Sequence, residues 1–178
     1  MLYVSKYDSP IGTCFLVSDE KALIGLWFEG QKYFQDSIKG ETLLENENDV
    51  IQKAKEWLDD YFAGKCPAIS EIPLAPRGSA FRQAVWKYLC EIPSGETTTY
   101  GEIAEKVAKD FGREHMSAQA VGGAVGHNPI SVIIPCHRVI GKDGSLSGYA
   151  GGIEKKRMLL KLEGLDDTKW RDTNDRIK

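Results

Sequence analysis

The run Val132-Ile133-Ile134-Pro135-Cys136-His137-Arg138-Val139 places a thiol beside an imidazole and a guanidinium, directly after three apolar residues. The apolar residues predict a short buried strand, and Pro135 fixes its own φ and stiffens the backbone that enters Cys136. Only the thiolate form of cysteine is a good nucleophile, and neighbouring cations lower a cysteine pKa. We therefore predict that Cys136 is reactive, although most free cysteines are buried and structural.

The composition is that of an ordinary globular protein of 178 residues, with 42% apolar and 28% charged residues. One or two domains with a sizeable core are expected. No apolar run approaches the roughly 20 residues of a membrane helix, and the N-terminal residues lack a secretory signal pattern. The cysteines and histidines are dispersed without zinc-ligand spacing. We predict a cytoplasmic protein that binds neither a metal ion nor a membrane.

The charge is divided unevenly along the chain, although the net charge is only −3. Residues 1–75 carry 7 Lys and Arg against 13 Asp and Glu, a net charge of −6. Residues 76–164 carry 12 against 9, a net charge of +3. The segment that contains Cys136 is thus the basic one, which permits contact with phosphates without establishing it.

Residues 1–75 are predicted to form an N-terminal domain of strands and one helix. Three neighbouring strands with short turns indicate an antiparallel meander over Met1–Tyr7, Thr13–Val17 and Ala22–Phe28. Residues 31–46 are polar and are expected to be irregular. Apolar residues at helical spacing then predict a helix from about Asn48 to Phe62, and Gly64 follows it as a stop signal. Residues 66–76 contain three prolines and are interpreted as an extended linker.

Residues 76–164 are predicted to form a second, mostly helical domain. Ser79, Thr99 and Ser117 are candidate N-caps of three helices, the third of which extends through Gly126. A last helix is expected over Ile153–Leu162. The polar segment 165–178 is interpreted as a frayed tail.

The helices after Thr99 and Ser117 suggest a helix-turn-helix, although the connection is longer than usual and a plain helical pair fits equally well. The second of these helices has almost no large side chains. The adjacent Gly122 and Gly123 each cost roughly 1 kcal/mol in a helix. Close approach of another backbone explains this cost, and so does tight packing against the domain's own core.

Together these residues resemble the O6-alkylguanine-DNA alkyltransferase family of single-turnover DNA repair proteins. The resemblance covers about residues 79–164, and residues 1–75 match only in outline. The ordered set is specific, whereas each motif alone is weak: Phe81-Arg82-Gln83-Ala84-Val85-Trp86, Ile92-Pro93-x-Gly95-Glu96, Thr99-Tyr100-Gly101-Glu102-Ile103-Ala104, Ala120-Val121-Gly122-Gly123-Ala124, Asn128-Pro129, Ile133-Ile134-Pro135-Cys136-His137-Arg138-Val139, Gly148-Tyr149 and Leu159-Leu160-x-x-Glu163.

The resemblance implies an α+β fold, with a ribonuclease-H-like N-terminal domain and a mostly helical C-terminal domain that contains a winged-helix-like helix-turn-helix. It also implies that Cys136 accepts an alkyl group from O6 of guanine, and that O4-alkylthymine is a possible second substrate. His137 would act as the base through a bound water, and Glu163 would orient the imidazole. No cofactor is implied, because the damaged base supplies the alkyl group.

The resemblance assigns further residues to the substrate. Tyr100, helped by the backbone N–H of Val139, would donate a proton to the leaving guanine. Asn128 would hold the loop that carries Cys136. Tyr149 would be a lid that packs on the alkyl group and the base.

The implied partner of a monomeric protein is double-stranded DNA, which is entered from the minor groove with the alkylated nucleotide flipped out. The residues expected at this interface are Gln119, Ala120, Gly122, Gly123, Arg138 and Lys156. Gln119 stands where many relatives carry an arginine that fills the gap left by the flipped base. Because Gln119 carries no positive charge, we expect weaker extrusion of the alkylated nucleotide or transfer of the gap-filling role to Arg113.

Three alternatives were weighed against repair. A non-catalytic damage-binding relative has tryptophan at the position of Cys136, so the cysteine argues against that class. A cysteine hydrolase needs a direct Cys136–His137 pair, which is awkward on an extended strand because adjacent side chains point to opposite faces. A methylation-responsive transcription regulator would need an additional domain. DNA repair by alkyl transfer is the prediction.

Overall fold

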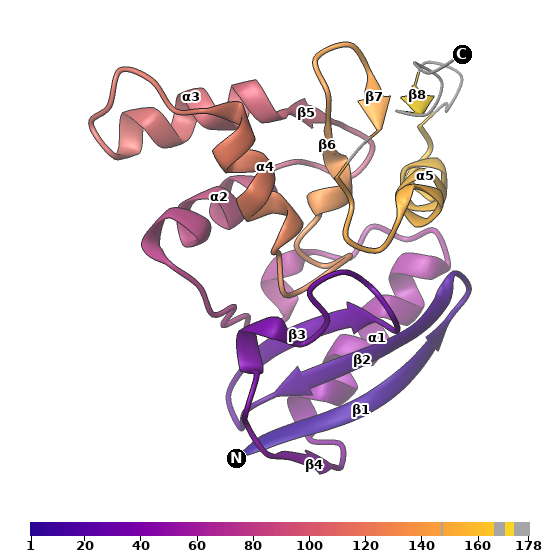
Figure 1. Ribbon diagram of the computed structural model, residues 1–178. Helices are drawn as coiled ribbons and strands as arrows, with labels where there is room; N and C mark the ends of the chain where they lie inside the picture. The colour runs from indigo at the N-terminus through magenta and orange to yellow at the C-terminus, as the bar shows by residue number, and fades with distance from the viewer. Residues whose placement is uncertain (147, 166–169, 173–178) are drawn as a thin grey trace. The chain divides into compact units, whose positions relative to one another are not determined.

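The computed structural model describes residues 1–146, 148–165 and 170–172, which form two compact units (Figure 1). The first contains Met1–Arg77 together with Pro129–Ile133, and the second contains Gly78–Asn128 and the described residues from Ile134 onward. Ser147, which precedes the Gly148-Tyr149 motif, and residues 166–169 and 173–178 of the predicted tail lie outside the described residues. The first unit has a mixed sheet, and the second is mostly helical with short strands, so the fold is α+β, as predicted.

The first unit is built on a sheet with strand order β3-β2-β1-β4. The predicted antiparallel meander is confirmed: its strands are β1 (Leu2–Ser9), β2 (Gly12–Ser18) and β3 (Leu23–Phe28). The expectation that residues 31–46 are irregular is wrong, because this segment contains the 3₁₀ turn η1 (Asp36–Ile38) and the strand β4 (Leu43–Glu45). Strand β4 pairs parallel to β1, a partner far away in sequence.

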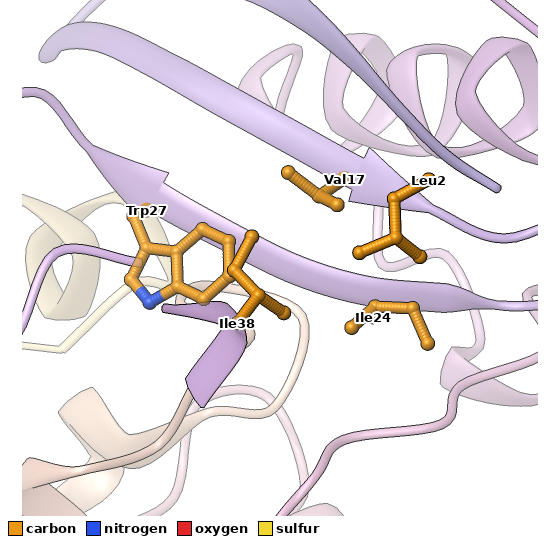
Figure 2. Packing of buried hydrophobic residues seen from close by; sticks show 5 residues of the cluster. All are labelled: Leu2, Val17, Ile24, Trp27 and Ile38. Atoms are coloured by element: carbon orange, nitrogen blue, oxygen red, sulfur yellow. The ribbon is translucent and has the colours of Figure 1, made fainter. Parts of the chain in front are cut away.

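One helix and a small apolar cluster complete the first unit. Helix α1 (Asp49–Phe62) begins after Asn48, whose side chain accepts a hydrogen bond from the N–H of Ile51, and packs against the sheet with its apolar face (Figure 1). Figure 2 shows the apolar cluster, which contains Leu2, Val17, Ile24, Trp27 and Ile38. The predicted linker contains the 3₁₀ turn η2 (Ile69–Glu71).

The predicted strand over Val132–Ile134 does not form. Val132 has φ 71°, and the N–H of Ile133 donates to the carbonyl of Ser131 at 2.8 Å, so the chain makes a tight turn there. A positive φ is costly for a β-branched residue, and Val132 adopts it while 1% exposed. The residues just before it pair with β3 instead, since the N–H of Ser131 donates to the carbonyl of Leu26.

The second unit contains the three capped helices that were predicted. They are α2 (Ala80–Cys90), α3 (Tyr100–Asp110) and α4 (Ala118–Gly126), and Ser79, Thr99 and Ser117 cap them. Thr99 and Glu102 form a reciprocal capping box. The three helices pack on one another, and Trp86 of α2 donates its indole N–H to the carbonyl of Ala124 in α4 at 2.9 Å.

Short elements and one helix complete the second unit. The 3₁₀ turn η3 (Cys136–Arg138) leads into β6 (Val139–Ile140), which pairs parallel with β5 (Thr98–Thr99). Strand β7 (Ser145–Leu146) pairs with β8 (Arg171–Asp172), so this part of the predicted frayed tail is ordered into a strand. Helix α5 (Ile153–Leu162) was predicted with these bounds.

Candidate active site

Cys136 lies at the start of η3, on a backbone bent by two successive turns. Pro135 has φ −81° and ψ 64°, and the N–H of Cys136 reaches back over it to the carbonyl of Ile134 at 2.8 Å. The N–H of Arg138 donates to the carbonyl of Pro135 at 3.0 Å. The sulfur is therefore held by a turn and not at the end of a strand, and the argument against a hydrolase from an extended Cys136–His137 pair no longer applies.

The Cys136 side chain is buried, and its environment favours the thiol in the resting protein. Burial raises the pKa of Cys136, while a hydrogen bond from Asn128 and the positive charge of Lys156 oppose this rise without cancelling it. The prediction that adjacent cations lower this pKa is therefore wrong. Arg138 directs its charge at Glu163, and His137 is uncharged. A base is needed to make the thiolate at the moment of reaction.

His137 is completely buried and contacts Glu163. Its Nε2 lies 2.6 Å from Oε2 of Glu163, and the ionised carboxylate can only accept, so Nε2–H donates. Burial lowers the pKa of His137 in spite of the carboxylate, so the ring is neutral. Nδ1 has no hydrogen-bond partner within the described ranges, so its lone pair is the position on the ring that can take a proton.

Glu163 follows the last residue of α5, and its carboxylate accepts hydrogen bonds from three residues: Gly95, His137 and Arg138. Arg138 donates from Nε to Oε1 at 2.7 Å and from Nη2 to Oε2 at 3.1 Å, and the N–H of Gly95 lies 3.4 Å from Oε1. Burial alone would raise the pKa of Glu163, but the hydrogen bonds and charges of His137 and Arg138 outweigh it and bring the pKa to about 2. Sequence reasoning had no local evidence for this proximity, which only the resemblance implied.

Asn128 lies beside the turn that carries Cys136. The side chain is buried, and its Nδ2 donates to the carbonyl of Ile134 at 2.8 Å. It also hydrogen-bonds to the sulfur. This is the placement expected of a residue that holds the loop of Cys136.

Tyr100 and the loop before α5 meet in the second unit. Gly148 has φ 72°, and a Cβ added there would lie 3.2 Å from the Tyr100 hydroxyl oxygen. The following Tyr149 is 8% exposed, so the predicted lid is packed into the unit and is not a surface residue. The Tyr100 hydroxyl thus lies against the backbone of Gly148, the residue before Tyr149.

Three predicted substrate contacts disagree with the structure. The N–H of Val139 donates to the carbonyl of Cys136 and is already used within the turn. Arg138 and Lys156 are 6% and 1% exposed, so neither presents its charge to a phosphate. Instead, both charges lower the pKa of His137, and the charge of Lys156 also opposes the rise in the pKa of Cys136. Helical spacing could have revealed Lys156, because it lies three and four residues before the inward-facing Leu159 and Leu160.

Helix α4 presents a face of small residues. Val121, Ala124 and Val125 are buried, whereas Gln119, Ala120 and Gly123 are exposed. A Cβ on Gly123 would meet no atom within 4 Å, and one on Gly122 would be only 3.8 Å from the Tyr100 ring, an ordinary contact. Tight packing against the described residues therefore does not explain the two glycines.

Two kinds of site find no support in the part of the chain that the structure describes. No three His, Cys, Asp or Glu side chains gather there as a metal site would require. None of the helices there is long and apolar enough to cross a membrane.

Comparison with known proteins gives matches along nearly the whole chain. Residues 2–76 match the family model described as 6-O-methylguanine DNA methyltransferase, ribonuclease-like domain, and residues 80–165 match the DNA binding domain of the same description. A methylated-DNA--protein-cysteine methyltransferase of Haemophilus influenzae is 43% identical over 162 residues, which cover 91% of this chain and 86% of the relative.

Solved structures agree with these matches. The crystal structure of Mycobacterium tuberculosis O6-methylguanine methyltransferase superposes with a TM-score of 0.76 at 42% identity, covering 92% of this chain and 93% of that one. The M. tuberculosis protein in complex with DNA also gives a TM-score of 0.76, at 41% identity over 90% of this chain and 92% of that one.

Proposed function

The chain belongs to the 6-O-methylguanine DNA methyltransferase family, and on this basis we propose that Cys136 is the cysteine that receives the alkyl group. The protein is a methylated-DNA--protein-cysteine methyltransferase, which repairs DNA by direct reversal of alkylation damage. The observation that carries the assignment of Cys136 is its place next to a buried, neutral imidazole that Glu163 orients at 2.6 Å.

The proposed reaction begins with the thiol proton. It passes from Sγ of Cys136 through one bridging water to Nδ1 of His137, while the Nε2–H of His137 remains hydrogen-bonded to Glu163. The sulfur then attacks the alkyl carbon in line, so that the S–C bond forms as the C–O6 bond breaks and its electron pair stays on guanine. The Tyr100 hydroxyl supplies the proton that neutralises the guanine anion. Solvent then takes the proton from His137 and returns one to Tyr100.

The product on the protein is a thioether, and no described group offers a route back to the thiol. We expect each molecule to act once and to be consumed in stoichiometric amounts. No cofactor takes part in this scheme, because the alkyl group comes from the base and the electron pair for the new bond comes from sulfur.

The proposal extends to DNA. Helices α3 and α4 would form a winged-helix-like helix-turn-helix, with α4 in the minor groove, which is only about 6 Å wide. The exposed small residues of α4, and the open space around Gly123, support this placement. Contacts to the backbone and groove shape would then supply most of the affinity, with little sequence preference.

The target base lies inside the duplex, so we expect the nucleotide to be flipped out at a cost of a few kcal/mol. We propose that Gln119, which is exposed on α4, occupies the gap, or that Arg113, which is exposed before that helix, takes this role with the charge that Gln119 lacks. Tyr149 would cover the flipped base. The protein would do this as a monomer, with a catalytic domain over residues 76–164, a tail over 165–178 and an N-terminal domain over 1–75.

Intact-mass measurement and peptide mapping test the assignment of Cys136. After incubation with a duplex containing one O6-methylguanine, we expect a gain of one methyl group, roughly 14 Da, on the peptide that contains Cys136. Cys136→Ser should show no gain. Cys66→Ser is the matched control, since this exposed cysteine lies in the other unit, and it should gain the methyl group as the wild type does.

The other outcomes are distinct. A methyl group on a different peptide would overturn the assignment of Cys136. Binding of the lesion by an unmodified protein would place this chain with damage-recognition proteins.

A further inference from the structure

Arg138 is a charged side chain that the catalytic scheme above does not use, although it is almost wholly inside the protein. Its guanidinium makes two parallel hydrogen bonds to Glu163 and a third from Nη1 to the carbonyl of Ile92 at 2.6 Å. Only 7% of its side chain is exposed. A buried Arg–carboxylate fork of this kind fixes geometry and charge together.

The carboxylate that Arg138 holds is in an unfavourable place for a negative charge. Glu163 caps the C-terminal end of α5, where the helix dipole is negative, and its side chain is only 2% exposed. A buried anion in such a position either acquires a cation or takes up a proton. The available cations are the Arg138 guanidinium and a protonated His137.

Charge balance decides between these two cations. With Arg138 in place, Glu163 is neutralised and His137 can remain uncharged. Without Arg138, the same balance is reached if either His137 or Glu163 takes up a proton. The imidazole is the more basic of the two groups, so we expect the proton on His137, where it would occupy Nδ1. The identity of the cation next to Glu163 therefore determines whether the imidazole can act as a base.

We propose that Arg138 is a positioning residue of the alkyl transfer reaction, which acts by neutralising Glu163 and so keeps His137 in the uncharged, Nε2-protonated form whose Nδ1 can accept the Cys136 proton. This inference rests on the proposed function of Cys136 and His137. It replaces the predicted contact of Arg138 with DNA.

The other charges around the imidazole act in the same direction or are too remote. Lys156 of α5 and Arg138 both lower the pKa of His137, and only Glu163 raises it. Cys136, on the same turn, is a thiol at rest. Helix α2, which packs against η3, contributes Cys90 near Arg138, and burial raises the pKa of Cys90 to about 11, so it is uncharged at neutral pH. Glu91, which follows α2, acts on Cys90.

Nitrogen NMR of the histidine rings tests the proposal directly, because the chain has only three histidines. In the wild type we expect His137 to remain neutral at about pH 7, with the proton on Nε2. In Arg138→Met we expect both ring nitrogens to be protonated at that pH, and the titration of His137 to move up by about 1 to 2 pH units. Arg138→Lys keeps the charge without the fork and should move it less.

Single-turnover transfer rates supply the second readout. Arg138→Met should slow transfer roughly 10-fold near neutral pH and recover towards the wild-type rate about 2 pH units higher. The double variant Arg138→Met/Glu163→Gln removes both charges, so the pH at which its rate falls should return towards that of the wild type. Arg77→Met is the control, because Arg77 pairs with Glu41 at the surface of the other unit.

The outcomes separate this proposal from a purely structural role and from the function itself. Loss of rate at every pH with a neutral His137 in Arg138→Met would overturn the proposal and make Arg138 a structural clamp. Failure of the wild type to transfer would overturn the proposed function, while the NMR titration would still decide the role of Arg138. If Arg138→Met does not fold, Arg138→Lys and the double variant decide the test.

Discussion

The protein contains two polar clusters with similar ingredients and different surroundings. In the first unit, Glu47 accepts hydrogen bonds from Ser5 and Lys55, and the Glu47 and Lys55 side chains are 38% and 22% exposed. In the second unit, Glu163 accepts from His137 and Arg138, and its side chain is 2% exposed. Both carboxylates have lowered pKa values.

The two clusters differ in whether their charges affect neighbouring groups. Water screens the Glu47 cluster, so its pairing is worth little and influences no other group. In the buried cluster no solvent compensates the charges, so each one sets the protonation of its neighbours. Burial therefore allows an ion pair to set the protonation state of a neighbouring group such as His137.

The largest effect that should separate the clusters comes from Glu163→Gln compared with Glu47→Gln. Glu163→Gln leaves the buried Arg138 cation uncompensated, so we expect a loss of about 3 kcal/mol in the free energy of unfolding. It also replaces the carboxylate, both of whose oxygens accept hydrogen bonds from His137 and Arg138, by a neutral amide with one acceptor oxygen, which should slow transfer about 100-fold or more. Glu47→Gln should cost less than about 1 kcal/mol and leave transfer unchanged.

Urea unfolding and single-turnover transfer measure both effects on the same samples. Equal losses of stability in the two variants would show that burial does not distinguish the clusters.

Local signals in the sequence predicted the helices well. Ser79, Thr99 and Ser117 were predicted as caps because each is a Ser or Thr directly before a helical segment. In the structure each side chain accepts a hydrogen bond from the N–H three residues ahead, which is a local contact. Strand β4 was missed because three residues carry little pattern and its partner β1 is distant in sequence. The turn at Val132 was mistaken for a strand, since an apolar run shows burial but not the sign of φ.

The candidate site also combines residues that local motifs predict with contacts that depend on distant segments. The motif Pro135-Cys136-His137 predicted Cys136 as the nucleophile and His137 as its neighbour, whereas the approach of Glu163 to His137 depends on how α5 packs. Arg138 and Lys156 were expected at the DNA interface from the family resemblance, and the structure buries both. Their burial follows from contacts that join distant segments, such as Arg138 to the carbonyl of Ile92.

A smaller effect is expected from Lys156→Met compared with Lys55→Met. Burial lowers the pKa of Lys156 from 10.5 to about 8, so between these values the unfolded chain binds more protons than the folded one. Wild-type stability should therefore rise with pH across this window, relative to Lys156→Met, by on the order of 2 kcal/mol. Lys55→Met is the matched variant in the exposed cluster, because the Lys55 side chain is 22% exposed.

Urea unfolding at several pH values between about 7 and 10 measures the difference, and other titrating groups cancel between variant and wild type. The same variant should slow iodoacetamide modification of Cys136, because the charge that opposes its raised pKa is gone. A stability gap that is constant with pH would contradict a buried ammonium.

The smallest effect extends the comparison to one helix of each unit. Gly123 on α4 has open space around it, so Gly123→Ala should raise the free energy of unfolding by roughly 0.5 to 1 kcal/mol. Gln52→Ala on an exposed position of α1 should also stabilise, by a few tenths of a kcal/mol. Only Gly123→Ala should weaken binding to duplex DNA, because only α4 is proposed to enter the minor groove.

Fluorescence anisotropy with a labelled duplex distinguishes the two variants. A methyl group that stabilises the free protein cannot weaken the complex unless the complex needs the space it occupies. Weaker binding by Gly123→Ala, together with higher stability, would therefore mean that this glycine is kept for the partner and not for the fold. Unchanged binding would place the DNA against another face of the second unit.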